Sequence, residues 1–308
     1  MRNRIEMLLA LDIISNVSTG SRLKRLLYNP AGYLIGMLFS KFVYPIFKKS
    51  LHVKKKTFFG LDIFLALPSG LDIYLLGAKS HHSEIRLAKF LCCHLKEKAV
   101  FYDIGGHVGY FSLLAAQLVG ENGKIIGFEA SPATFYYYQK NVSQDQKILA
   151  IEKAVSDHNG QLTFYEYPNL YSEYNSIETT QYEDEKWASS VKSKEVTVES
   201  VSLDDYVTTH GDIPDMIKID VEGAELKVIK GANNILKNHK PLVIMEFIPP
   251  KIQDWDNDAH YLAVQEMLNL GYEGFRILED GQVEKTLLNV EWLSRIDSDN
   301  LVFIHPQK

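Results

Sequence analysis

The amino-acid sequence predicts an α/β fold in which a mostly parallel sheet is covered by helices on both faces. Short apolar runs typical of strands alternate with amphipathic helical patterns between residues 99 and 247, and this alternation indicates strand–helix–strand units. The predicted strands are apolar along nearly their whole length, as buried parallel strands are. With 308 residues, 46% of them hydrophobic, the chain is long enough to bury a large core.

The charge is distributed unevenly and predicts two parts. Residues 1–56 hold eleven Lys or Arg side chains against Glu6 and Asp12, although the whole chain carries a net charge of -6. We therefore expect a basic helical N-terminal segment, 1–56, followed by a larger and more acidic domain, 57–308. The negative total argues against nucleic acid as the main partner.

An apolar stretch at residues 31–47 approaches the length of a membrane-spanning helix, but Lys41 and Pro45 interrupt it. Basic side chains precede and follow it, so one interpretation is a helix that lies on an anionic membrane surface, with peripheral contact through residues 22–56. A helical cap packed on the main domain explains the same pattern, and we favour it.

Two features favour a cytoplasmic location, with the N-terminal segment as the membrane contact if there is one. Glu6 and Asp12 lie inside the first apolar run, which is not typical of a cleaved secretory signal. Cys92 and Cys93 are adjacent within a helical pattern, so we expect reduced thiols and not a disulfide.

Strand and helix patterns follow the basic segment in a regular order. Two strands joined around residues 68–70 predict a β-hairpin, and a helix is expected at 82–97. The later strands are predicted at 99–104, 124–130, 148–157, 216–221 and 241–247. The helices between them are predicted at 109–119, 131–142 and 224–236. The polar connection 165–200 is long for a compact domain, which predicts a functional or disordered loop.

Three glycines follow the strand at 99–104, in the stretch VFYDIGGHVGYFS. In an open parallel sheet, ligands bind beyond the carboxyl ends of the strands. Gly105 and Gly106 allow positive φ and leave no Cβ in the way of a ligand, and Gly109 permits close packing of the next helix. That helix is also expected to present unpaired N–H groups. The spacing GxGxxG of dinucleotide sites is absent, so a nucleotide-dependent oxidoreductase is the weaker alternative.

Two acids at strand ends limit further which class of ligand can bind. Asp103 would repel a pyrophosphate but attract an ammonium or sulfonium group. Glu129 comes twenty residues after Gly109 and can accept both ribose hydroxyls of an adenosine. A ligand with a cationic amino-acid end and a nucleoside end is S-adenosylmethionine, which is the predicted cofactor.

A second motif, IKIDVEGAELKVIKGA, places Asp220 and Glu222 at the end of the strand at 216–221. Residues two apart on a strand share a face, and like charges held close raise one pKa, which prepares a general base. In the alternative interpretation, Glu222 only caps the following helix. Glu246 is a third acid on the same rim, but because no histidine clusters with these acids we predict no metal.

Five segments together resemble a known family. DIGGHVGYFSLLAA, FEASPATFYYYQKNV, AVSDHNGQLTFYEY, VSLDDYV and IKIDVEGAELKVIKGA occur in the order and rough spacing of the FkbM-like S-adenosylmethionine-dependent methyltransferases, over about residues 80–250. The resemblance implies a Rossmann-like class I methyltransferase fold. It also implies O-methylation, often of a hydroxyl on a sugar, a glycan or a natural product, so a sugar or small-molecule hydroxyl is the expected acceptor.

The resemblance also implies roles for particular residues. By position, the methionine-side turn is formed by Asp103, Gly105, Gly106, His107 and Gly109. Glu129 would hold the ribose. Ser156 and Asp157 would lie near the adenine, and Asp220 and Glu222 near the reacting centre.

The sequence departs from the family pattern DIGANVG at two positions, where Gly106 replaces alanine and His107 replaces asparagine. His107 either donates to the cofactor carboxylate or tilts the turn, and it is a second candidate for the base. A membrane-tethered module that binds the cofactor without turnover is the alternative outside catalysis. The aromatic loop 165–187 suits stacking on a sugar, or packs on its own neighbours.

Overall fold

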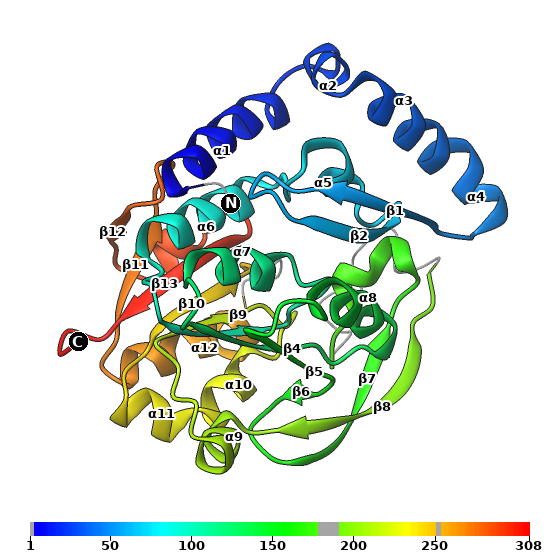
Figure 1. Cartoon of the computed structure of the whole chain (residues 1–308). Coiled ribbons are helices and arrows are strands. Elements are labelled where there is room, and N and C mark those ends of the chain that lie inside the picture. Colours follow the sequence, from blue (N-terminus) through cyan, green and yellow to red (C-terminus); the bar gives the residue numbers. More distant parts are fainter. Residues whose placement is uncertain (1–2, 178–190, 251–253) are drawn as a thin grey trace.

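The computed structural model describes residues 3–177, 191–250 and 254–308. Its centre is an eight-stranded sheet with the strand order β12-β11-β13-β10-β9-β3-β4-β5 (Figure 1). The strands are β3 Val100–Ile104, β4 Lys124–Phe128, β5 Ile148–Ile151, β9 Met216–Ile219, β10 Leu242–Phe247, β11 Glu273–Ile277, β12 Val283–Lys285 and β13 Asp299–Ile304. Neighbours from β10 to β5 are parallel, and β13 is antiparallel to both β10 and β11. The predicted mostly parallel sheet is confirmed.

The order of the strands reverses between β3 and β9. From β3 the chain continues to β4 and β5 on one side, whereas β9 and β10 lie on the other side. Ile104 and Ile219, the last residues of β3 and β9, are partners in the register. A crevice at this reversal is where open α/β sheets bind their ligands.

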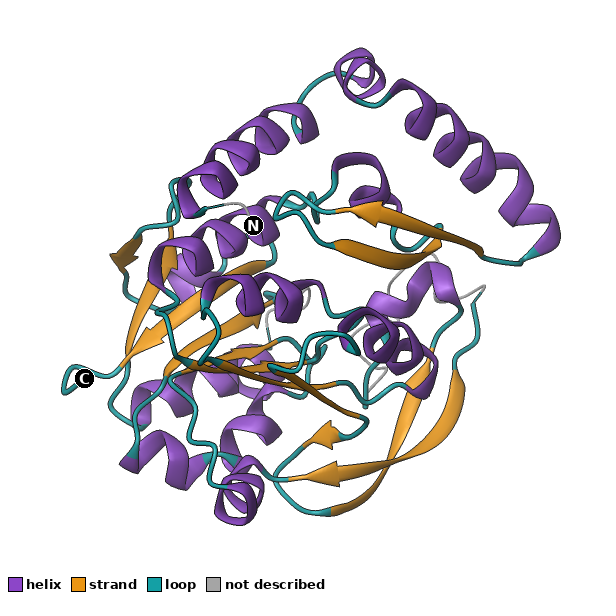
Figure 2. Cartoon of the chain, in the orientation of Figure 1, coloured by secondary structure: helices purple, strands orange, loops and turns teal. Residues whose placement is uncertain are grey.

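Helices cover both faces of the sheet (Figure 2). One face carries α6 His82–His94, α7 Tyr110–Leu118 and α8 Pro132–Val142, and the other carries α9 Leu203–His210, α10 Glu225–Gly231, α11 Asn233–Asn238 and α12 Ala259–Asn269. Successive side chains of β3 enter the two cores in turn: Phe101 packs in one and Tyr102 in the other. Because both faces of the sheet are buried, the strands are apolar along their length and do not alternate between polar and apolar residues.

The β-hairpin is present, but its strands differ from those predicted. β1, Leu51–Lys56, pairs with β2, Asp62–Leu67. The hairpin therefore joins the end of the basic segment 1–56 to the start of the domain predicted at 57–308. The segment LDIYLL, predicted as the second strand, is the helix α5, Leu71–Leu76. Its start is held by the Asp72 carboxylate, which accepts the N–H of Ile73, and Gly77 ends it in the left-handed conformation that glycine favours.

The long connection and the strand before it also differ from the prediction. The strand expected at 148–157 is two short strands, because after β5 the chain leaves the sheet and Ala154–Val155 (β6) pairs with β8. β8, Lys194–Val201, also pairs antiparallel with β7, Gly160–Glu166, so strands occupy both ends of the predicted loop. Part of the aromatic loop 165–187 lies outside the described residues.

The N-terminal segment is helical from Arg4 to Phe47 and forms an arm that arches over the domain (Figure 1, blue). It consists of α1 Arg4–Ser18, α2 Arg22–Tyr28, α3 Pro30–Leu38, a π-helical turn at Phe39–Val43 and α4 Tyr44–Phe47. Met7, Leu11 and Ile14 of α1 are buried in the core that contains α6. The Arg4 guanidinium donates to the carbonyls of Cys92, Leu95 and Leu118, which ties the start of the arm to the domain.

Candidate active site

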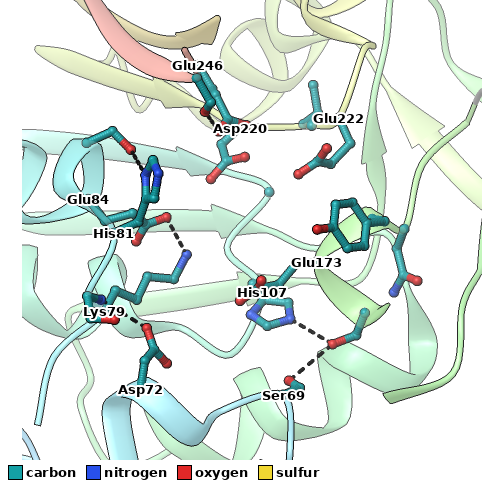
Figure 3. A pocket seen from close by; sticks show the side chains of 18 of the residues that line it. Ser69, Asp72, Lys79, His81, Glu84, His107, Glu173, Asp220, Glu222 and Glu246 are labelled. Atoms are coloured by element: carbon teal, nitrogen blue, oxygen red, sulfur yellow. Dashed lines mark hydrogen bonds and ion pairs between the residues drawn. The ribbon is translucent and has the colours of Figure 1, made fainter. Parts of the chain in front are cut away.

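A cavity of about 1110 Å³ opens at the carboxyl ends of β3, β4, β9 and β10, where the strand order reverses. Five residues singled out from the sequence line it together: Gly105, His107, Glu129, Asp220 and Glu222. Figure 3 shows the carboxylates of Asp220, Glu222 and Glu246 on one side of this cavity and His107 on the other. Residues from four strand ends therefore converge on one space.

The remaining predicted residues do not line the cavity, and Asp103 differs most from its expected role. Its side chain is 1% exposed. One carboxylate oxygen accepts a hydrogen bond from Ser112 Oγ at 2.7 Å, and the other lies 3.4 Å from Lys218 Nζ. The cation that Asp103 faces is therefore a lysine of the protein, and its carboxylate does not line the cavity.

Gly106 and Gly109 make room for a buried side chain and not for a ligand. A Cβ at either position would lie 2.6 Å from a ring carbon of Tyr138, which is fully buried and whose hydroxyl meets Ser112 Oγ at 2.5 Å. Gly105 is different, because a Cβ there would lie 1.8 Å from the backbone oxygen of Asp220 and its φ is +77°. Glycine at 105 thus lets the turn after β3 approach the loop after β9.

Three amides of the turn after β3, those of Gly105, Gly106 and His107, donate hydrogen bonds within the protein. Gly105 and Gly106 both donate to the carbonyl of Phe128, at 3.0 and 2.9 Å. The N–H of His107 donates to Glu129 Oε2 at 2.8 Å, and Ser131 N–H donates to Glu129 Oε1 at 2.9 Å. The turn therefore orients the Glu129 carboxylate at the edge of the cavity.

Burial dominates the electrostatics of Glu129. Glu129 is only 7% exposed. Burial raises the pKa of its carboxyl to about 7, although the hydrogen bonds from the two amides oppose this rise. Near neutral pH the group is therefore divided between its charged and neutral forms.

His107 is held in the left-handed backbone conformation, with φ of 49°, which is uncommon for a residue with a side chain. Its Nε2 lies 3.2 Å from Ser172 Oγ, while Nδ1 is buried and has no hydrogen-bond partner among the described residues. Burial and the nearby Lys79 lower the pKa of His107 to about 3. The imidazole is therefore neutral at physiological pH.

Asp220, Glu222 and Glu246, across the cavity from His107, form a tight group: one carboxylate oxygen of each lies within 4.8 Å of the other two. Burial alone would raise the pKa of Asp220, but Lys218, with Nζ 3.0 Å from its carboxylate, and Lys79 lower it to about 2. The pKa of Glu246 is raised well above its usual range by burial and by the charges of Asp220 and Glu222. The neutral form of Glu246 is therefore favoured beside the charged Asp220.

Two lysines that the sequence analysis did not single out complete the site. Lys218 of β9 is 1% exposed and lies between Asp103 and Asp220. Lys79, in the connection from α5 to α6, pairs with Glu84 at 2.7 Å; the carboxylates of Glu84, Asp220 and Glu173 raise its pKa well above normal against the effect of burial. Lys218 could have been noticed, because a lysine inside an apolar strand must be paired, and its position two residues before Asp220 puts both on one face.

The residues expected near the adenine lie just beyond the cavity. Ser156 is fully buried, and Asp157 pairs with His158, whose Nδ1 is 2.7 Å away. The preceding residues, Ala154 and Val155, line the cavity instead. They give it an apolar wall together with Phe128.

Curated relatives at low identity are methyltransferases. The hexuronic acid methyltransferase AglP of Haloferax volcanii is 23% identical over 146 residues, which cover 46% of this chain and 54% of that protein. Methyltransferase 1 of Beauveria bassiana is 25% identical over 169 residues, covering 50% of this chain and 66% of the relative. The chain thus spans less than two thirds of the length of either relative.

Solved structures were also compared. The methyltransferase FkbM of Methylobacillus flagellatus has a TM-score of 0.39 and 14% identity, covering 73% of this chain and 56% of that one. The S-adenosylmethionine-dependent O-methyltransferase of Thermotoga maritima has a TM-score of 0.41 and 11% identity, with 86% and 82% covered. The family assignment does not rest on either of them.

The assignment rests on a family model. The model of the methyltransferase FkbM domain matches residues 103–273, which is more than half of the 308 residues. The match begins at Asp103, includes the segments around Glu129 and Asp220, and extends to the first residue of β11. The chain therefore belongs to the FkbM family of S-adenosylmethionine-dependent methyltransferases.

Proposed function

We propose that this methyltransferase transfers a methyl group to a hydroxyl of a sugar, a glycan or a natural product, with Asp220 as the base. The observation that carries the proposal is that a carboxylate kept ionised by a buried lysine lines the same cavity as Glu129. The relative that acts on hexuronic acid supports a sugar acceptor.

The residues of the cavity fit the cofactor, although not through Asp103. Glu129 keeps lone pairs for two ribose hydroxyls after accepting its two amide donors. His107 Nδ1, buried and without a partner among the described residues, can donate to the methionine carboxylate in the tautomer that carries its proton there. Phe128, Ala154 and Val155 offer an apolar wall for the adenine. Bound S-adenosylmethionine supplies a methyl group activated by a positively charged sulfur.

Asp220 has a low pKa, yet it is strong enough as a base for this step. The hydrogen of the attacking hydroxyl becomes more acidic as its oxygen gives up electron density, so a weak base can accept it. Lys218 keeps Asp220 ionised at neutral pH, and burial beside the charges of Asp220 and Glu222 favours the neutral form of Glu246. Glu222, which also adopts a left-handed conformation with φ of 53°, is the second candidate. The neutral imidazole of His107 is the third.

The outer part of the cavity is cationic, which suits an acceptor that carries a carboxylate or a phosphate. Arg22, Arg25 and Lys41 of the arm line it, and none of them pairs with an acid among the residues that the structure describes. Lys79 lies deeper, beside the acids. We place the reaction in the cytoplasm, which the free thiols of Cys92 and Cys93 support.

The first experiment is methyl transfer from labelled S-adenosylmethionine into fractions of a cell lysate, followed by identification of the labelled product. Incorporation into a hydroxyl of a sugar or natural product supports the proposal. Labelling of a nitrogen or carbon atom contradicts O-methylation. Calorimetric binding of S-adenosylhomocysteine without any transfer supports a binding module, and quenching of NADH fluorescence on binding supports an oxidoreductase.

Glu129→Ala should weaken the binding of S-adenosylhomocysteine by about 10-fold to 100-fold, because hydrogen bonds to a charged group contribute about 1.5–3 kcal/mol. Isothermal titration calorimetry measures this at a pH of about 8, where the wild-type carboxyl is ionised. Glu166→Ala is the matched control, since Glu166 accepts hydrogen bonds from Ser131 and Ala133 nearby but does not line the cavity. Equal affinities for the two variants would remove Glu129 from the ribose site.

The same affinity should depend on pH. Because the pKa of Glu129 is raised to about 7, the carboxyl is protonated below that pH and cannot accept two ribose hydroxyls. Binding should therefore weaken as the pH falls below about 7, by at most about tenfold per unit. The Glu129→Ala variant should show a flatter profile between about pH 6 and pH 8; an equally steep profile would assign the titration to another group.

A further inference from the structure

The arm carries a face of large apolar side chains that is exposed in the part of the chain that the structure describes. Along Pro30–Phe47, one row is exposed at intervals of four residues: Leu34, Leu38, Phe42 and Ile46, which are 55%, 56%, 62% and 74% exposed. Ile35, Val43 and Phe47 lie beside this row and are also exposed. The segment has a mean hydropathy of 1.2 and only 17% of it is buried. We call these seven side chains the outer face.

The opposite side of the same helices is fixed to the domain. Gly32, Gly36 and Tyr44 are buried, and they precede the exposed row by two residues, which is about 200° around a helix. A Cβ at Gly36 would lie 2.6 Å from Leu71 of α5, and Asn29 Nδ2 donates to the carbonyl of Leu75 at 3.0 Å. The arm is therefore held so that the outer face is turned away from α5.

The positive charge around the outer face indicates which kind of partner it can bind. Residues 22–56 hold nine Lys or Arg side chains and no Asp or Glu. Among them, only Lys54 forms an ion pair within the described part of the chain, with Asp62. A second copy of the chain would bring two such basic surfaces together and be repelled. An apolar strip flanked by unpaired cations complements a bilayer with anionic headgroups.

We propose that the outer face docks the protein on the surface of an anionic lipid bilayer, with the axis of α3 and α4 parallel to the membrane plane. The inner contacts of Gly36 and Asn29 would be lost if the helix crossed the bilayer. Lys41 and Pro45 within the segment also suit a surface position better than a span.

Docking in this orientation has a consequence for the active site. Tyr33, Met37 and Lys41, again four residues apart, line the catalytic cavity, and each immediately precedes a residue of the exposed row. Neighbouring residues point about 100° apart around a helix, so the arm borders the cavity with one side and would meet the lipid with another. If the proposed methyl transfer is correct, the acceptor would reach the site at the membrane.

Cosedimentation of the full chain with vesicles tests the proposal without an acceptor. Binding is expected to vesicles of equal parts phosphatidylglycerol and phosphatidylcholine, to weaken in high salt, and to be much weaker with phosphatidylcholine alone. Lys48→Gln combined with Lys49→Gln should lower partitioning by about 25-fold, since each cation near such a surface contributes about fivefold. Lys230→Gln combined with Lys237→Gln is the matched control on α10 and α11 and should change nothing.

The apolar part is tested by Leu38→Asp combined with Phe42→Asp, which should lower partitioning by about 100-fold. Leu287→Asp, at a side chain that is 78% exposed far along the chain, should have no effect. Both variants should keep wild-type binding of S-adenosylhomocysteine, so a failure here is separate from a failure of the proposed function. Absence of vesicle binding in low salt, a dimer that Leu38→Asp dissociates, or resistance to carbonate extraction would each overturn the proposal.

Discussion

Replacing Asp220 with asparagine should lower kcat for methyl transfer by about two to four orders of magnitude, the range typical of a lost general base. Asparagine has nearly the same shape but cannot accept the proton of the acceptor hydroxyl. Because the Asp220 carboxylate lies across the cavity from His107, the affinity for S-adenosylhomocysteine should change by less than about threefold. Single-turnover kinetics with the acceptor identified from the lysate separates the two quantities.

Glu222→Gln provides the matched comparison, since Glu222 lines the same cavity and its carboxylate lies within the same group of acids. We expect a loss of less than about tenfold, because Glu222 would then contribute charge and not accept the proton. A larger loss for Glu222→Gln than for Asp220→Asn would make Glu222 the base. Thermal unfolding of both variants excludes a loss of folded protein as the cause.

The sequence was informative where a residue's role follows from its position on a strand. Apolar strands and their alternation with helices predicted the sheet, and acids at the ends of β4 and β9 predicted two walls of the cavity. The hairpin was less predictable, because LDIYLL has the composition of a strand, whereas in the structure it is a helix in which Asp72 accepts the N–H of Ile73 and which ends at Gly77.

The role of Asp103 could not be read from its position at the end of β3. The sequence gives no sign that Lys218 of the neighbouring strand β9 and Ser112 of α7 satisfy its carboxylate. For the same reason the space at Gly106 was assigned to a ligand, and Gly109 to the cofactor turn by resemblance, although the ring of Tyr138 occupies the space that both leave. Contacts between segments far apart in sequence decide which polar residues face a cavity and which support it.

Lys218→Met should lower the free energy of unfolding by about 3–5 kcal/mol, as expected when one partner of a buried ion pair is removed. Lys218 Nζ lies 3.4 Å from Asp103 and 3.0 Å from Asp220, and its side chain is 2% exposed. Methionine has a similar length but leaves both carboxylates without their cation. Equilibrium unfolding in urea measures the loss. Lys124→Met, which breaks the pair with Asp212 at a side chain that is 43% exposed, should cost less than about 1 kcal/mol.

The pH dependence of this loss gives an independent check, and its sign follows from Asp220. Because Lys218 and Lys79 lower the pKa of Asp220 from 3.8 to about 2 in the folded protein, against the effect of burial, the ion pair stabilises the fold above about pH 4 and this contribution disappears as the pH falls through about 2. The difference between wild type and Lys218→Met should therefore shrink in acid. Adding Asp103→Asn to Lys218→Met should restore part of the lost stability, since it removes one of the two uncompensated charges. A deficit that stays constant in acid, or a double variant whose losses simply add, would mean that Lys218 acts through packing and not through its charge.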